Sequence, residues 1–279
     1  MFLHVFFAVF VSALSFFIPV MPFSFHQESP AAPNEAAYAE LPSVATPPVP
    51  AATSTAGVDV PILVYHIVRP SYLGDDAAVR AIALTPGTFD AELLHLQSAG
   101  YHVVSFRNLE AYFANSTPLP TKPIILSFDD GWRDQFVYAF PLLEKHRDTA
   151  TFFIFTNAIG HRGFVTWSDL HALIAAGMTV GDHSRSHPFL TKITDPGKLR
   201  DEIVGSKQIL EQGLGVPITE FAYPFGQYNP AVISLLKQAD FKSARGDYWF
   251  GNFQPVDRLY TLSALNAPTT TAAFDARFP

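Results

Sequence analysis

The chain has 279 residues, of which 48% are hydrophobic, and this is enough for one sizeable core in one or two domains. Its formal charge of −7 argues against a protein that binds nucleic acid by neutralising phosphates, so no nucleic acid partner is expected. The absence of cysteine excludes disulfides, thiolate metal sites and a cysteine nucleophile, so that any metal must be held by His, Asp or Glu.

The first 26 residues predict a segment that targets the chain for export or anchors it in a membrane. Phe2 to Phe25 is almost entirely apolar and is close to the ~20 residues that cross a bilayer as a helix. No Lys or Arg precedes Arg69 and no small-residue cleavage site is evident, so a cleaved signal peptide and a retained anchor both stay open. Either one predicts that the rest of the chain lies outside the cytoplasm, whether secreted, periplasmic or membrane-anchored.

Residues 27–57 are predicted to be a disordered linker. They are rich in Pro, Ala, Ser and Thr and have no periodic apolar face. A segment of this composition cannot bury enough surface to offset its conformational entropy. The folded domain is therefore expected to begin at Val58 and to cover residues 58–279.

The domain is predicted to alternate strands with helices, since short apolar runs favour buried strands and a 3.6-residue apolar spacing favours helices. The expected strands are residues 60–65, 103–106, 123–128, 150–155, 178–180 and 220–223, with a last group near 242–245 and 259–262. The expected helices are residues 88–99, 109–114, 136–146, 168–176, 198–212 and 230–239. Repeated strand–helix units imply an α/β fold with a mostly parallel sheet, open or closed into a barrel, whose chemistry gathers at the carboxyl ends of strands.

Two adjacent carboxylates, Asp129 and Asp130, follow the clearest of these strands. Carboxylates at the end of a buried strand are costly unless a positive group lies beside them. Because neighbours in sequence point in different directions, one of them can bind a cation while the other faces a substrate. Asp-Asp-Gly is also a common helix cap and turn, so the doublet alone leaves both interpretations open.

A pair of histidines, His183 and His187, follows the predicted strand end at Gly181. If this segment is helical, histidines four residues apart share one face, and two imidazoles on one face suit Zn²⁺ or a similar ion. With ten histidines in the chain such a pair can also arise by chance. Together with Asp130 the pair would form a two-histidine, one-carboxylate metal site with open positions for water and substrate.

Four segments occur in a fixed order along the domain: Leu-Ser-Phe-Asp-Asp-Gly at 126–131, Ala-Thr-Phe-Phe at 150–153, Gly-Asp-His-Ser-Arg-Ser-His at 181–187 and Phe-Ala-Tyr-Pro-Phe-Gly at 221–226. Together they resemble the polysaccharide deacetylase family, also called the NodB-homology domain or carbohydrate esterase family four. The resemblance covers most of residues 58–267. It implies a distorted (β/α) barrel with fewer than eight units, a divalent metal that is usually Zn²⁺, and hydrolysis of the acetamide on N-acetylhexosamine residues of a glycan.

The resemblance also implies roles for single residues. Asp129 would be the general base, and Asp130, His183 and His187 would be the metal ligands. The backbone N–H of Phe225 would help to bind the oxyanion. Among the aromatic residues, Tyr223 in the last motif and Trp132 directly after the aspartate doublet are the expected substrate contacts. Three arginines, Arg162, Arg185 and Arg245, are further candidates for substrate contact that no spacing argument supports.

Two departures from the family pattern stand out. Many members carry an arginine where this chain has Ala222, and that arginine orients the base through a further aspartate; Asp247 is a candidate for a part in this arrangement. The late histidine that usually supplies the general acid is missing, because no histidine follows His187. The ending of residues 63–66, Leu-Val-Tyr-His, resembles the poly-N-acetylglucosamine deacetylase branch, in which the terminal strand is shifted to the front. His66 is therefore expected to be the general acid, with a structural histidine as the alternative.

The expected function is removal of N-acetyl groups from an exported glycan, either poly-N-acetylglucosamine or a peptidoglycan-like polymer. Two alternatives remain. The same metal site could hydrolyse another amide or ester, because a fold does not fix a substrate. The barrel could also bind glycans without catalysis, although the presence of a base and all three ligands argues against this.

Overall fold

The computed structural model describes residues 56–115, 117–246 and 251–279. The chain divides into two units, residues 1–31 and 32–279, and the first lies entirely outside the described residues. Of the predicted linker, only residues 56 and 57 are described. Asp247 also lies outside the described residues. In the part that is described, no helix has both the length and the apolar character needed to cross a bilayer.

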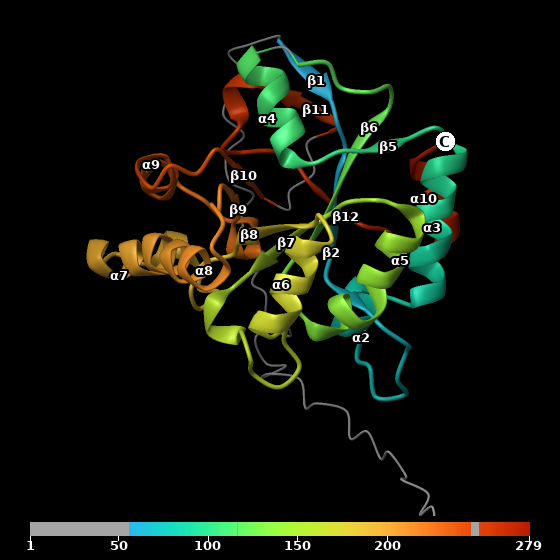
Figure 1. Ribbon diagram of the computed structural model, residues 1–279, viewed down its shortest axis with the longest axis horizontal. Coiled ribbons are helices and arrows are strands. Elements are labelled where there is room, and N and C mark those ends of the chain that lie inside the picture. The colour runs from blue at the N-terminus through green and yellow to red at the C-terminus, as the bar shows by residue number, and fades with distance from the viewer. Residues whose placement is uncertain (1–55, 116, 247–250) are drawn as a thin grey trace, which may run out of the picture. The chain divides into compact units, whose positions relative to one another are not determined.

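Parallel strands form the centre of the domain (Figure 1). They lie side by side in the order β10 (Ser243–Arg245), β9 (Glu220–Ala222), β8 (Thr179–Asp182), β7 (Thr151–Ile154), β6 (Pro123–Phe128), β2 (Ile62–Tyr65) and β12 (Leu265–Asn266), and β5 (His102–Val103) also pairs with β6. Every pair in this sheet is parallel. An antiparallel pair, β1 (Gly57–Asp59) with β11 (Phe253–Pro255), and a short parallel pair, β3 (Ile67–Val68) with β4 (Ala83–Leu84), stand apart from it.

The chain before β12 connects the two outer strands of the sheet. Ala244 of β10 donates its N–H to the carbonyl of Leu259 at 2.8 Å and accepts from the N–H of Leu262 at 3.0 Å. Three residues after Leu262, β12 begins to pair with β2 at the opposite edge. This connection closes the sheet into a distorted barrel, and the predicted (β/α) barrel with fewer than eight units is confirmed.

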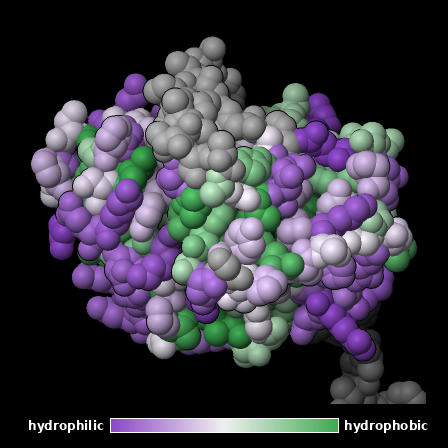
Figure 2. All heavy atoms as spheres, turned by 90° about the horizontal axis from the view of Figure 1, so that it is seen from above, coloured by the Kyte–Doolittle hydropathy of each residue, from purple (hydrophilic) through white to green (hydrophobic). Residues whose placement is uncertain are grey.

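Helices surround the strands (Figure 1). α3 (Pro86–Ser98) packs against α5 (Phe140–His146) and α10 (Thr271–Arg277), while α6 (Trp167–Ala175) packs against β8 and α8 (Ser206–Leu214). The others are α2 (Ala77–Ile82), α4 (Phe106–Asn115), α7 (Pro196–Arg200) and α9 (Pro230–Gln238), and two π-helical turns, Gln135–Ala139 and Asp201–Gly205, lead into α5 and α8. Phe106 and Leu109 of α4 close the barrel at the amino-terminal ends of its strands. Figure 2 views this end, where hydrophilic side chains cover most of the surface.

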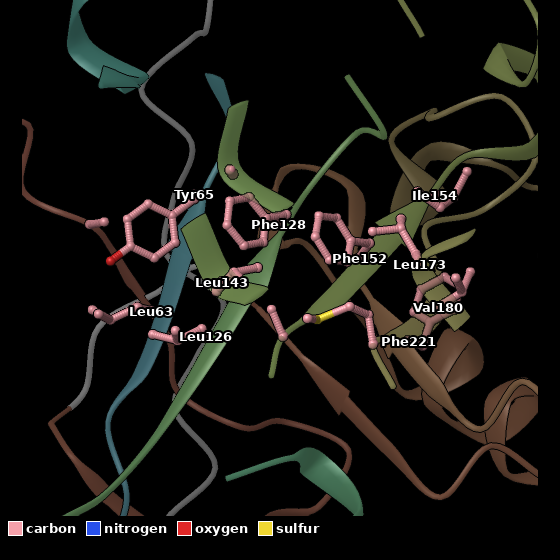
Figure 3. Packing of buried hydrophobic residues seen from close by; sticks show 14 of the residues in the cluster. Leu63, Tyr65, Leu126, Phe128, Leu143, Phe152, Ile154, Leu173, Val180 and Phe221 are labelled. Atoms are coloured by element: carbon pink, nitrogen blue, oxygen red, sulfur yellow. The ribbon is translucent and has the colours of Figure 1, made fainter. Parts of the chain in front are cut away.

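Alternate residues of each strand enter two separate hydrophobic clusters. The cluster inside the barrel, here called the inner core, includes Val64, Ile125, Phe153 and Ala222. The cluster between strands and helices, here called the outer layer, includes the residues next to these in sequence. In the outer layer the rings of Tyr65, Phe128 and Phe152, which are register partners on β2, β6 and β7, form a row with centroids 5.2 and 4.8 Å apart (Figure 3).

The predicted elements agree with the structure where apolar runs are long, and strand 123–128 has the predicted ends. The expected strand 103–106 is wrong at its end because Ser105 and Asn108 exchange hydrogen bonds that begin α4 at Phe106. Residues 259–262 pair with β10 without forming a strand of their own. The strands β1, β3, β4 and β11 and the helices α2 and α10 were not predicted, and the domain begins with β1 at Gly57.

Candidate active site

Three of the predicted site residues follow directly after parallel strands of the barrel. His66 comes one residue after β2, Asp129 one residue after β6 and His183 one residue after β8. The sheet pairing continues to these positions, because Asp129 N–H donates to the carbonyl of Tyr65 at 2.9 Å and His183 N–H donates to that of Ile154 at 3.0 Å. The carboxyl ends of the parallel strands therefore bring these side chains to one rim of the barrel.

Asp130, His183 and His187 form a compact group of possible metal ligands. One carboxylate oxygen and one ring nitrogen from each histidine lie within 4.8 Å of one another. Asp130 Oδ1 is 3.6 Å from His183 Nε2 and 3.4 Å from His187 Nε2. Two imidazole nitrogens and one carboxylate oxygen are a donor set that Zn²⁺ takes in catalytic sites, so these residues fit a single divalent ion.

Further contacts orient two of these ligands. His183 Nδ1 donates to the backbone carbonyl of Ala222 at 2.8 Å, which leaves Nε2 to face Asp130. Trp132 Nε1 donates to Asp130 Oδ2 at 3.0 Å and leaves Oδ1 for the histidines. Both contacts fix the direction of a metal ligand, and the contact of His183 also fixes its tautomer and raises the basicity of its ring.

Both histidines are held in their neutral form. Burial lowers the pKa of His183 to about 4, although the charges of Asp129 and Asp130 oppose the shift. Burial also lowers the pKa of His187 against the same two carboxylates. A neutral imidazole has the free lone pair that metal binding needs, so the environment of both residues suits this role at neutral pH.

The two histidines meet through a loop, and the helical segment assumed for them is wrong. β8 ends at Asp182, and the residues after it form no helix up to Pro188. Asp182 Oδ1 accepts the N–H of Ser184 at 2.9 Å, and Ser184 Oγ accepts the N–H of His187 at 3.0 Å. Polar side chains that bond to a nearby backbone favour such turns over helix, and here the turn directs both rings to Asp130.

Left-handed backbone conformations gather around this group. Seven non-glycine residues in the described part of the chain have positive φ, and four of them lie here: Asp130 (73°), Ser184 (70°), His187 (58°) and Phe225 (56°). Such a conformation costs of order 1 kcal/mol or more for each residue and persists only where surrounding contacts impose it. The loops that carry the ligands are therefore held by tertiary contacts against their local preference.

Asp129, the predicted base, is ion-paired inside the barrel with Arg245 of β10. Arg245 Nη2 donates to Asp129 Oδ1, and the side chains are 1% and 5% exposed. The guanidinium also lies 4.7 Å above the ring of Phe153. Burial by itself raises the pKa of Asp129, but the charge of Arg245 and the hydrogen bond that it donates outweigh burial and lower the pKa. Asp129 is therefore an ionised carboxylate at neutral pH.

Arg245 supplies the guanidinium that the family pattern places at position 222. Arg245 and Ala222 are register partners on the adjacent strands β10 and β9. Ala222 belongs to the inner core together with Phe153, and its small side chain leaves room there for the guanidinium of Arg245. Arg245 was predicted only as a candidate for substrate contact. The register between β9 and β10, which the structure provides, cannot be read from the sequence.

His66 lies on the same side of the site as Asp129. It follows β2, which pairs in parallel with β6, the strand that ends directly before Asp129. Gln135, which the sequence analysis did not single out, donates from Nε2 to the backbone carbonyls of His66 and Asp129. This amide therefore fixes the ends of β2 and β6 relative to each other. A proton donor at His66 is compatible with this position and stays a prediction.

The remaining predicted contacts differ in their surroundings. Phe225 lies in a tight turn, Pro224–Gly226, with its ring 4.6 Å from that of His187. Trp132 stacks on Phe164 with centroids 4.7 Å apart, so one face of its indole is covered. Tyr223 is only 1% exposed and donates its hydroxyl to the carbonyl of Tyr260 at 2.8 Å. Burial argues against direct contact of the Tyr223 ring with a substrate.

Comparisons with known proteins show what the chain is similar to in sequence and in fold. Residues 116–244 match the model of the family described as polysaccharide deacetylase. YxkH of Bacillus subtilis, named as a candidate polysaccharide deacetylase, is 23% identical over 183 residues, which are 66% of this chain and 62% of YxkH. The poly-beta-1,6-N-acetyl-D-glucosamine N-deacetylase of Staphylococcus aureus is 22% identical over 203 residues, covering 64% of this chain and 68% of that protein. The chain thus spans about three fifths of the length of YxkH.

Solved structures share the fold. The Streptococcus pyogenes deacetylase PplD in complex with acetate has a TM-score of 0.70 at 24% identity, over 76% of this chain and 93% of that one. IcaB from Ammonifex degensii has a TM-score of 0.67 at 24% identity, over 77% and 94%. Over residues 116–244 the chain is thus similar to the polysaccharide deacetylase family, and its fold is the barrel that these solved structures share.

Proposed function

We propose that this protein is a metal-dependent hydrolase that removes N-acetyl groups from an N-acetylhexosamine-containing polysaccharide, such as poly-N-acetylglucosamine or a peptidoglycan-like glycan. One observation carries the proposal: Asp129, paired with Arg245, directly precedes Asp130, which lies with His183 and His187 in a group that could hold a metal ion. The match to the deacetylase family model and the similarity to the Staphylococcus aureus enzyme support the choice of substrate.

The donor set favours Zn²⁺ as the ion. Asp130, His183 and His187 would hold it, and each offers one ligand atom toward a common point. Three protein ligands leave a position open for substrate or water, as in catalytic zinc sites. When bound, the ion polarises the acetamide carbonyl as a Lewis acid.

The side chains around the ion then handle the protons of the reaction. Asp129 accepts a proton from the water that attacks the acetamide carbonyl, and Arg245 keeps it ionised for this task. The N–H of Phe225 donates to the oxygen as it becomes negative. His66 gives a proton to the leaving amine as the carbon–nitrogen bond breaks. The products are acetate and a glucosamine residue with a free amine.

The proposal also covers where the protein acts. Residues 1–26 would be a signal peptide or membrane anchor, and residues 27–57 a linker that holds the catalytic domain away from the membrane if the segment is retained. The apolar composition of the first segment and the Pro/Ala/Ser/Thr-rich composition of the second support this. The catalytic domain would then meet its glycan outside the cytoplasm.

The direct test is to purify the full chain, quantify bound metal and measure acetate release from N-acetylglucosamine oligomers. We expect about one zinc ion per chain together with acetate release. Asp129→Asn should retain the metal and lose about 10²–10⁴-fold in turnover, as expected for loss of a general base. His183→Ala should lose the metal.

Each other outcome has a defined meaning. No bound metal together with no acetate from any acetylated glycan contradicts the proposal. Glycan binding without acetate release would indicate a non-catalytic barrel, and release only from another amide or ester would change the substrate class. Loss of metal in Asp129→Asn would exchange the roles of the two aspartates. If His66→Ala keeps near wild-type turnover across pH, His66 is not the general acid.

A further inference from the structure

An exposed loop with two large hydrophobic side chains begins three residues after His66. This loop, here called the rim loop, comprises Arg69–Asp76 and connects β3 with α2, and it extends below α2 in Figure 1. Tyr72 is 46% exposed and Leu73 is fully exposed. Exposed aromatic residues beside an active site are common points of contact with ligands, because a ring offers a large apolar face at small cost in conformational entropy.

The rim loop is held in one conformation by a pair of charged side chains. Arg69 donates to both carboxylate oxygens of Asp75, at 3.1 and 2.6 Å. Asp75 in turn accepts the N–H of Tyr72 at 3.0 Å, and its own N–H donates to the carbonyl of Tyr72 at 3.1 Å. The guanidinium of Arg69 lies 4.3 Å from the centre of the Tyr72 ring. One face of the ring is therefore covered and fixed, so the other face can bind a ligand without first being ordered.

The rim loop is joined to the catalytic segment. Arg69 Nε lies 4.0 Å from Asp134 Oδ2, and Asp134 directly precedes Gln135. Gln135 is the residue whose amide bonds to the backbone carbonyls of His66 and Asp129. The rim loop and the predicted acid and base are thus fixed to two consecutive residues of the same segment.

A cavity of about 200 Å³ lies at the base of the rim loop. Its polar lining comes from Arg69, Arg80, Asp75, Ser71, Thr85, Thr88 and Thr269, of which Asp75 is already paired with Arg69. Thr269 follows β12, the neighbour of β2 in the sheet, so the cavity is at the same rim of the barrel as His66. A pyranose ring presents a face of C–H groups and an edge of hydroxyls, which match an exposed aromatic ring beside guanidinium and hydroxyl donors.

We propose that Tyr72 and this cavity form a distal subsite that binds a second pyranose residue of the substrate chain, while the residue to be deacetylated occupies the metal site. The inference rests on the proposed function, since it assigns the second position of the same glycan. It follows that the enzyme binds oligomers long enough to reach both positions more tightly than it binds short ones.

The test compares KM and kcat of the full chain for N-acetylglucosamine oligomers of two to six residues, with β-1,6 and with β-1,4 linkages. Tyr72→Ala should raise KM for the longer oligomers about three- to tenfold and leave kcat and the KM of the shortest oligomer unchanged. Tyr72→Phe should behave like the wild type, because the ring is kept. Leu73→Ser is the control, since it removes a neighbouring and more exposed apolar side chain that has no ring.

Two results would overturn the subsite. One is a KM for Tyr72→Ala that equals the wild-type KM at every length, and the other is an equal rise at all lengths. An effect of Leu73→Ser as large as that of Tyr72→Ala would show that general apolar contact, and not stacking, is responsible, and would also contradict the proposal. If the wild type releases no acetate, calorimetry with the hexamers decides: weaker binding by Tyr72→Ala supports the subsite, and no binding by the wild type refutes it.

Discussion

The inner core and the outer layer each contain a buried carboxyl group, and the two groups are in opposite charge states. Asp129, at the top of the inner core, is paired with Arg245 and has a lowered pKa. Glu92 of α3, in the outer layer, has the hydroxyl of Tyr65 as its hydrogen-bond donor at 3.1 Å, and burial raises its pKa to about 8. Both are almost fully buried, so the nature of the partner and not the degree of burial decides which of them is charged.

The comparison also shows how the strands deliver the site. Side chains of a strand alternate between two faces, so every second residue points into the barrel. Val64, Phe153 and Ala222 lie in the inner core. Continuing this alternation by two residues beyond Val64 and Phe153 leads to His66 and Phe155. The same alternation leads from Ile125 through Ser127 to Asp129, four residues on, and from Gly181 to His183, two residues on. The active site is therefore the next layer of inward-facing positions above the inner core.

The largest effect is expected for the charge in the inner core. Arg245→Met should lower the free energy of unfolding by about 3–5 kcal/mol, because it leaves Asp129 buried without a counter-charge. Turnover should fall as well, since the base loses the group that positions it. Urea unfolding and acetate release measure the two effects. The double variant Arg245→Ala/Ala222→Arg moves the arginine to the register partner on β9 and should restore part of the turnover. Wild-type stability and turnover of Arg245→Met would contradict the role of the pair.

Glu92, the carboxyl group in the outer layer, should make stability fall as pH rises, whereas Asp129, whose pKa is lowered, should make stability fall as pH decreases. The folded pKa of Glu92 is raised, so its stabilising contribution is complete below pH 4.5 and is lost as pH rises toward about 8. The loss is a few kcal/mol, ~5 kcal/mol at most. Glu92→Gln should remove this dependence, still accept a hydrogen bond from Tyr65, and melt above the wild type at pH 9. Glu144→Gln, at an exposed position of α5, is the control and should melt like the wild type at both pH values. If Glu92→Gln has the same melting temperature as the wild type at pH 5 and also at pH 9, Glu92 is not buried as a neutral acid.

A smaller effect is expected from filling space in the inner core. A Cβ atom on Gly181 would lie 2.5 Å from two ring carbons of Phe153, so Gly181→Ala should destabilise the fold by about 1–3 kcal/mol. Since the Phe153 ring lies beneath Arg245, turnover should fall too. Gly87→Ala is the control, because its Cβ would meet one atom at 3.9 Å. Thermal unfolding gives the melting temperatures of Gly181→Ala and Gly87→Ala. Equal melting temperatures of the two variants would contradict tight packing at Gly181.

The smallest effect should separate the two faces of a single strand. Phe152 faces the outer layer and Phe153 the inner core. Replacing either with Leu should cost about 1–2 kcal/mol of stability. Only Phe153→Leu should also lower kcat, because it removes the ring beneath the guanidinium, a contact worth ~1 kcal/mol. Equal kcat values for Phe152→Leu and Phe153→Leu would contradict the prediction that only the face of β7 toward the inner core supports catalysis.

The sequence predicted the strands that precede the proposed metal ligands better than the turn that brings the two histidines together. Strand 123–128 was predicted correctly because it is a run of six buried residues that begins with a proline and ends at an Asp-Asp-Gly turn. The turn that joins His183 to His187 was not, because it depends on hydrogen bonds from Asp182 and Ser184 that override helical spacing.

The partner of the base was beyond the reach of the sequence for another reason. β10 has three residues and all are buried, so no polar–apolar alternation marks which side of the strand Arg245 occupies. Only the register with β9 shows that Arg245 stands where position 222 would otherwise supply the arginine. In a strand that is buried on both faces, the sequence does not show which side chains point into the barrel. For this reason Arg245 was not predicted as the residue that sets the charge state of Asp129.

The pairing of Asp129 with Arg245 has a consequence for the order of folding. These residues are 116 positions apart, and β10 is reached only after the metal ligands have been synthesised. The segment that then closes the barrel, through Leu262 to β12, comes later still. A nascent chain that ends before β10 thus holds every ligand but lacks the cation beside its base. Since such long-range contacts form slowly, catalytic competence should be among the last properties the chain acquires.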